Sequence, residues 1–69
     1  MKFTERFNEM LDICGKTQNQ IASEIHVKKQ CVSDYKHGKS VPSLETLFLL
    51  CKSLEVSADY LLGLDDNKF

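Results

Sequence analysis

Apolar residues recur along the chain at the spacing of one helix face, and no stretch alternates apolar and polar residues as a strand does. In the first segment an apolar stripe is formed by Phe3, Phe7, Met10, Leu11 and Cys14. This stripe predicts a helix over residues 3–14. The same periodicity predicts four further helices, over residues 18–25, 29–36, 44–54 and 58–62. The expected fold class is all-α, a compact five-helix bundle.

Residues that favour helix ends stand at the predicted boundaries. Thr17 can cap the second helix, and Gln20 stands three residues later, as in a capping box. Ser43 and Ser57 can cap the last two helices. A glycine follows three of the helices, where a left-handed residue often ends a helix: Gly15, Gly38 and Gly63.

The predicted core takes the inward positions of these stripes. Residues 44–54 are the most apolar segment, so we expect their helix to lie centrally. Ala22 is small, which lets the helix over 29–36 approach the helix over 18–25 closely. The core is expected to contain Phe7, Leu11, Ile21, Ala22, Ile25, Val32, Tyr35, Leu47, Phe48, Cys51 and Leu61.

Composition places the chain among small globular domains, with 69 residues, of which 42% are hydrophobic and 28% charged. We expect one domain over residues 1–64, followed by a short acidic tail over 65–69 that is frayed. No apolar run is long enough to span a membrane and no signal peptide is visible, so a cytoplasmic location is expected. The length does not favour an enzyme, because so short a chain cannot wall a deep cleft and keep a core.

The three cysteines form no C-x-x-C pair, and together with the two histidines they lack the spacing of metal ligands. We expect reduced thiols that fill space in the core. No metal site and no cofactor is predicted.

The charges are distributed unevenly. Residues 1–40 carry seven Lys or Arg against five Asp or Glu, whereas residues 41–69 carry two against five. Residues 26–40 alone hold four lysines and one aspartate. A basic stretch of this kind is typical of a surface that contacts nucleic acid.

Two short helices joined by a tight turn near His26 and Val27 form the centre of a longer pattern. The pattern is Gln18-x-x-Ile21-Ala22-x-x-Ile25-x-Val27, Val32-x-x-Tyr35-x-x-Gly38-Lys39, Pro42-Ser43-Leu44-x-Thr46-Leu47 and Leu54-x-Val56-Ser57-x-Asp59-Tyr60-Leu61-Leu62-Gly63. It resembles the phage-repressor and Cro-like (Xre-type) helix-turn-helix domains over residues 3–63. The resemblance implies a five-helix fold that binds DNA, usually as a dimer on two-fold symmetric operators, and regulates transcription. His26 stands where that family has a glycine, and Lys28 where it has a serine or threonine cap.

The helix over 29–36 has two faces at about 100° per residue. Val32 and Tyr35 point inward. The outward residues expected to read bases in the major groove are Lys29, Gln30, Ser33 and Asp34. The candidate pairings are Gln30 with adenine, Lys29 with guanine, and Asp34 accepting from the cytosine amino group. Two alternatives for Asp34 are repulsion of phosphates at wrong sites and pairing with a nearby lysine.

A second set of residues is expected to hold phosphates. The resemblance implies this role for Gln18, at the start of the second helix, where backbone N–H groups suit an anion. Lys39 and Ser40 lie in the loop after Gly38 and can hold the backbone on the other flank. The full predicted set is Thr17, Gln18, Lys28, His37, Lys39 and Ser40.

The sequence therefore predicts a sequence-specific DNA-binding transcriptional regulator, repressor-like, whose partner is a double-stranded DNA operator. The resemblance implies a homodimer that meets near Ser57 to Leu64. No membrane or small-molecule ligand is predicted. Two alternatives keep the fold: the DNA-binding antitoxin of a small operon, and a protein-interaction module that has lost DNA binding.

Overall fold

The computed structural model describes residues 1–69 and contains five helices and no strand. The helices are α1 (Phe3–Ile13), α2 (Gln18–Glu24), α3 (Lys29–Lys36), α4 (Leu44–Leu54) and α5 (Ala58–Leu62). Each lies where the sequence predicts it, and only α1 and α2 end one residue earlier than expected. The prediction of an all-α, five-helix fold is confirmed. None of the five helices has the length and apolarity needed to cross a membrane.

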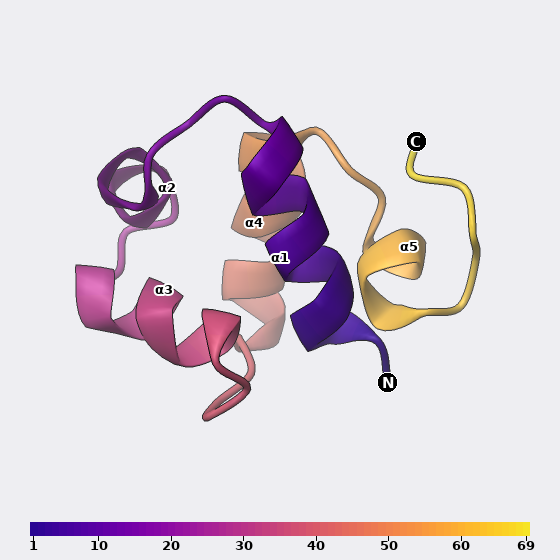
Figure 1. The fold of residues 1–69 in the computed structure, drawn as a ribbon, viewed down its shortest axis with the longest axis horizontal. Coiled ribbons are helices and arrows are strands. Elements are labelled where there is room, and N and C mark those ends of the chain that lie inside the picture. Colours follow the sequence, from indigo (N-terminus) through magenta and orange to yellow (C-terminus); the bar gives the residue numbers. More distant parts are fainter.

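The helices α1 and α4 stand at the centre of the molecule, with α2 and α3 on one side and α5 on the other (Figure 1). The helix α1 packs against both α3 and α5, while α4 packs against α2 and α5. The helices α2 and α3 also pack closely on each other. This arrangement leaves the outer face of α3 free, at the end of the molecule opposite the C-terminus (Figure 1).

Fourteen buried apolar residues form one continuous core. From the predicted set, the residues that the structure buries are Phe7, Ile21, Ala22, Ile25, Val32, Tyr35, Leu47 and Leu61. Leu11 and Cys51 are only half-buried, at the edge of the core. The buried apolar residues absent from that set are Phe3, Met10, Leu50, Leu54, Val56 and Tyr60, and the structure also buries Arg6 and Ser53.

The prediction for Phe48 is wrong, because its side chain is 61% exposed. In α4 the buried residues are Ser53 and three leucines spaced by three and four residues: Leu47, Leu50 and Leu54. Leu44 and Phe48 lie on the other side of this helix, and Leu44 is 84% exposed. The run of leucines made the apolar stripe look wider than the face that the neighbouring helices cover.

Three aromatic rings join α1 to the inner face of α3. Phe3 and Phe7 stack with ring centroids 5.3 Å apart. The ring of Tyr35 meets both edge-on, at 6.2 Å from Phe3 and 6.1 Å from Phe7. Such pairs contribute about 0.5–1.5 kcal/mol each beyond the area they bury. Next to them the Asn8 amide donates hydrogen bonds to the carbonyl of Thr4 at 2.9 Å and to that of Lys36 at 2.8 Å. The end of α3 is therefore fastened to α1.

The predicted helix caps are confirmed. Thr17 and Gln20 form a complete capping box at the start of α2, and the hydroxyls of Ser43 and Ser57 accept from the amides of Thr46 and Tyr60. The glycines after α1, α3 and α5 have positive φ, as expected. Glu55, at the end of α4, is left-handed as well, with φ 54°. This last feature had no signal in the sequence, because glutamate rarely adopts that conformation.

The acidic tail packs against α1 and α5, so the prediction that it frays is wrong. The carbonyl of Lys68 accepts a hydrogen bond from the amide of Ser57 at 2.7 Å. The ammonium group of Lys68 lies 2.8 Å from Oε2 of Glu9. The tail therefore runs back along the helices.

Arg6 is the residue that fastens the tail, and it is 9% exposed although it is charged. Its guanidinium group donates to the carbonyls of Tyr60 and Asp65, both at 2.7 Å, and to Oδ1 of Asp66 at 2.7 Å. It also lies 4.2 Å from the centre of the Tyr60 ring. A buried guanidinium is tolerated only when its donors are satisfied, and here three bonds meet that need.

Candidate nucleic-acid interface

The turn between α2 and α3 is tight because of one left-handed residue. His26 has φ 60°, in the left-handed region that favours glycine and that histidine tolerates better than most residues. The amide of Val27 donates to the carbonyl of Ala22 at 3.0 Å, which closes the turn. Ala22 is 5% exposed and Val32 is fully buried, so small and branched side chains meet where α2 and α3 cross. This is the geometry expected of a helix-turn-helix.

The third helix has one buried face and one polar face, as predicted. Val32 and Tyr35 are buried, and the pKa of the Tyr35 phenol is raised, chiefly by that burial. On the other face Lys29 and Gln30 are exposed, and Ser33 and Asp34 are half-buried. The structure therefore brings the four predicted base-reading residues onto one face of α3.

Two hydrogen-bonded pairs lie along this polar face. Nε2 of Gln30 donates to Oδ1 of Asp34 at 3.0 Å. Nδ1 of His37 lies 2.8 Å from the carbonyl oxygen of Ser33 and 3.4 Å from its hydroxyl. Both pairs join residues four apart, which face each other on a helix. Lys29 takes part in no ion pair.

The lysines around α3 carry charges that no carboxylate neutralises. The structure contains three ion pairs, which join Arg6 to Asp66, Lys16 to Glu24, and Lys68 to Glu9. None includes a lysine of residues 26–40, and all four of these lysines are exposed: Lys28, Lys29, Lys36 and Lys39. Four unpaired cations at one end of a chain with net charge −1 make a local positive surface.

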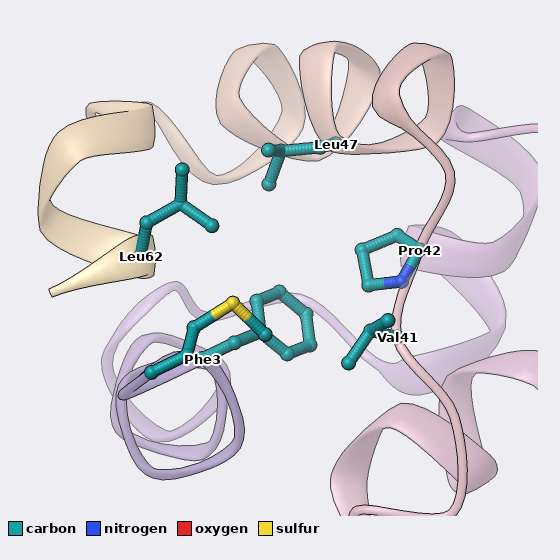
Figure 2. A pocket seen from close by; sticks show the side chains of 6 residues that line it. Phe3, Val41, Pro42, Leu47 and Leu62 are labelled. Carbon is teal, nitrogen blue, oxygen red and sulfur yellow. The ribbon is translucent and has the colours of Figure 1, made fainter.

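The loop after α3 carries Lys39 and Ser40, both exposed. The amide of Lys39 donates to the carbonyl of Asp34 at 2.9 Å, which ties the loop to α3. At the other end of the loop, Val41 and Pro42 line a small apolar pocket of about 100 Å³. In this pocket Val41 and Pro42 face side chains of α1, α4 and α5 (Figure 2). The pocket is smaller than the ~300–1,000 Å³ of small-molecule sites, so we do not assign it a ligand.

The starts of α2 and α3 are capped differently. The hydroxyl of Thr17 accepts from the amide of Gln20 at 3.1 Å, and Oε1 of Gln20 accepts from the amide of Thr17 at 2.9 Å. The capping box leaves the hydroxyl proton of Thr17 as a donor, beside the half-buried Gln18. No side chain caps α3, where Lys28 occupies the N-cap position. Thr17, Gln18 and Lys28 stand at helix starts on the α2–α3 side, and their contact with phosphate stays a prediction.

Lys16 differs from the lysines around α3, because its ammonium group is paired within the fold. It lies near α2 but donates to Oε1 of Glu24 and to the carbonyl of Ser53, both at 2.8 Å. The pKa of Glu24 is lowered by the hydrogen bond from Lys16 first, and by that from the Ser53 hydroxyl second. This network ties α2 to α4, so the ammonium group of Lys16 is already paired within the fold.

Asn8 is a residue of the site that sequence reasoning missed. Its bond to the carbonyl of Lys36 fixes the end of α3 from a residue 28 positions away. Asparagine inside a helix carries no pattern that names such a partner. Only the packing of α1 on α3 shows it.

Comparisons with known proteins agree with this geometry. The family description "helix-turn-helix" matches residues 9–61. The chain is 35% identical over 63 residues to the cryptic phage CTXphi transcriptional repressor RstR of Vibrio cholerae, covering 91% of this chain and 56% of that protein. It is 32% identical over 66 residues to the transcriptional regulator ImmR of Bacillus subtilis, covering 96% and 52%. It is 31% identical over 63 residues to the transcriptional activator BcrR of Enterococcus faecalis, covering 91% and 31%. The chain thus spans about half the length, or less, of these relatives, and no solved structure gives a significant match.

Proposed function

This chain belongs to the helix-turn-helix family, and from that premise we propose that it is a sequence-specific DNA-binding regulator of transcription. The observation that carries the proposal is the outer face of α3. Polar side chains cover that face, and the four lysines around it are unpaired. A surface of this kind suits the base edges and phosphates of a DNA groove.

In this proposal one set of residues contacts the bases and another set contacts the phosphates. Lys29, Gln30, Ser33 and Asp34 enter the major groove with α3, and the side chains of Lys29, Gln30 and Ser33 meet base edges. The residues that hold the phosphates on both flanks are Thr17, Gln18, Lys28, His37, Lys39 and Ser40. Phosphate contacts set the position of the domain, and base contacts set its sequence preference.

We further propose that the regulation is repression. Among the relatives, the one 35% identical to this chain is named a transcriptional repressor. A small domain that occupies a promoter represses by excluding other proteins, and it needs no further surface for this. Activation would require an additional contact with the transcription machinery.

A homodimer on a two-fold symmetric operator is also proposed, since one short α3 reads only a few base pairs. The proposed contact lies near Ser57 to Leu64, where the side chain of Leu64 is 76% exposed. Half-sites would then lie about 34–36 Å apart, one turn of DNA. Sedimentation should show Leu64→Ser to be monomeric, while Phe48→Ser, which removes an exposed apolar side chain from α4, should dimerise normally. A monomeric wild-type chain that binds only single half-sites would contradict the dimer.

Selection of bound sequences from a random DNA pool tests the main proposal. A conserved sequence is expected, and its binding should weaken steeply as salt concentration rises. No binding to any DNA at low salt would contradict the proposal and favour a protein-interaction module. Binding without any enriched sequence would support only non-specific, electrostatic binding to DNA phosphates and would contradict sequence-specific recognition. An antitoxin would show the same DNA binding but would also hold a partner protein, which co-purification detects.

A further inference from the structure

We propose that Asp34 is a positioning residue that orients the Gln30 side chain for base reading, and does not itself read a base. The inference rests on the proposed DNA-binding function and deepens it. It starts from one contact on the polar face of α3, where Nε2 of Gln30 donates to Oδ1 of Asp34 at 3.0 Å.

The chemistry of the two groups fixes the direction of this hydrogen bond. A carboxylate only accepts hydrogen bonds, whereas a carboxamide has a donating and an accepting end. The terminal torsion of glutamine is broad and roughly two-fold, so a free Gln30 could present either end outward. Beside Asp34 only one arrangement is favourable, with the amide nitrogen toward the carboxylate.

This arrangement leaves one edge of the Gln30 amide available. Of its two N–H groups, one is engaged with Asp34, and the other stands beside Oε1. That donor and acceptor match N7 and the N6 amino group of adenine in the major groove. Guanine presents two acceptors on the same edge, so the fixed Oε1 would face an oxygen there. Asp34 therefore lets Gln30 distinguish adenine from guanine.

Asp34 is well held for this role. It is half-buried on the polar face of α3, and its backbone carbonyl accepts from the amide of Lys39 at 2.9 Å. No lysine lies within ion-pair distance of its carboxylate. The structure thus assigns Asp34 to Gln30, in place of a lysine partner.

The experiment compares Asp34→Asn with Asp34→Ala. Both variants remove the negative charge, but asparagine keeps an oxygen that can accept from Gln30. The operator position that Gln30 reads is first identified as the one at which Gln30→Ala loses its base preference. Affinities are then measured for all four bases at that position, at one salt concentration, with circular dichroism and thermal melting as controls for folding.

The expected result is graded. Asp34→Ala should reduce discrimination at the Gln30 position by about fivefold or more, the lower end of what one bidentate pair supplies. Asp34→Asn should keep more of it, because an acceptor remains. In the double variant Gln30→Ala with Asp34→Ala, removal of Asp34 should change base preference no further, since the residue it positions is gone.

Three results would overturn the proposal. Asp34→Ala could keep full discrimination at the Gln30 position. It could relax a different position that prefers cytosine, which would make Asp34 a base reader. It could also strengthen binding to every sequence equally with no change in preference, which would make it only a phosphate-repelling charge. A wild-type chain that selects no sequence would instead contradict the proposed function itself.

Discussion

The two ends of this molecule treat their charges in opposite ways. At the end formed by α1, α5 and the tail, Arg6 and Lys68 each meet a carboxylate, and Arg6 is buried among three acceptors. At the end formed by α2 and α3, the four lysines of residues 26–40 meet none. The first end has used its charges to hold the chain together. The second leaves its lysines without a carboxylate partner.

The difference follows from how each end is packed. The crossing of α2 and α3 is filled by apolar side chains such as Ala22 and Val32, so it needs no ion pair. The other end is closed by a tail with little apolar surface, and hydrogen bonds to Arg6 replace what packing cannot supply. The comparison predicts that substitutions of charged residues at the α1–α5 end change stability, and that those of the lysines at the α2–α3 end change DNA binding.

Arg6→Ala should have the largest effect on stability. It removes three charge-assisted hydrogen bonds and the contact with the Tyr60 ring, so unfolding free energy should fall by about 2–4 kcal/mol. Urea unfolding measures this, and Lys52→Ala is the matched control: this exposed lysine has no carboxylate partner and lies 5.4 Å from the centre of the Phe48 ring, so its change should stay below about 1 kcal/mol. DNA affinity at a temperature where the variant stays folded should be unchanged. Equal losses for the two variants would mean that the tail contacts contribute nothing.

Ala22→Leu tests the apolar packing between α2 and α3, and urea unfolding measures its effect. The residue is 5% exposed at the crossing of α2 and α3, and added methylenes there should cost about 1–3 kcal/mol. Unlike Arg6→Ala, this variant should also weaken DNA binding, because α3 is displaced from its place on α2. A stable Ala22→Leu chain with normal affinity would show that the crossing is loose.

Lys39→Ala sharpens the comparison because it removes one unpaired positive charge and no packing contact of the core. Stability should stay within about 0.5 kcal/mol of wild type, because the side chain is exposed and makes no ion pair. Affinity for all sequences should fall about equally, and the slope of log affinity against log salt should shrink by about 0.9 if one phosphate contact is lost. An unchanged slope would make Lys39 an ordinary surface lysine.

The smallest effect concerns acid stability at the paired end. The pKa of Glu9 is lowered from 4.5 by hydrogen bonds from Lys68 first and Tyr60 second. Its contribution is therefore fully present above pH 4.5 and is lost as pH falls through the lower folded-state pKa. Thermal melting between neutral pH and pH 2 should show this loss, and Glu9→Gln should make the acid dependence shallower. A Glu9→Gln profile parallel to wild type would contradict it.

The helices and the outer face of α3 could be predicted because their signals are local. Thr17 with Gln20, and Val32 with Tyr35, stand within four residues of each other, and periodicity reports contacts at that range. The core prediction for Phe48 was wrong because periodicity shows an apolar stripe on a helix but does not show which part of it other helices cover.

Arg6 and the tail could not be predicted for a different reason. The partners of Arg6 stand 54 to 60 residues further along the chain, and a single arginine in an amphipathic helix carries no sign of them. The pairing of Gln30 with Asp34 is local, yet it was missed as well. Their spacing of four places them side by side on the helix, but a base partner predicted for each residue alone does not include their contact.

The hydrogen bonds of Asn8 have a consequence for genetics. Its amide joins the carbonyl of Thr4 in α1 to that of Lys36, so the first helix sets the angle at which α3 is presented. A screen for altered operator choice should therefore recover changes at position 8, although the residue belongs to neither the base-reading nor the phosphate-holding set. Such changes would act as second-site suppressors of substitutions in α3, restoring recognition by tilting the helix and not by replacing a contact.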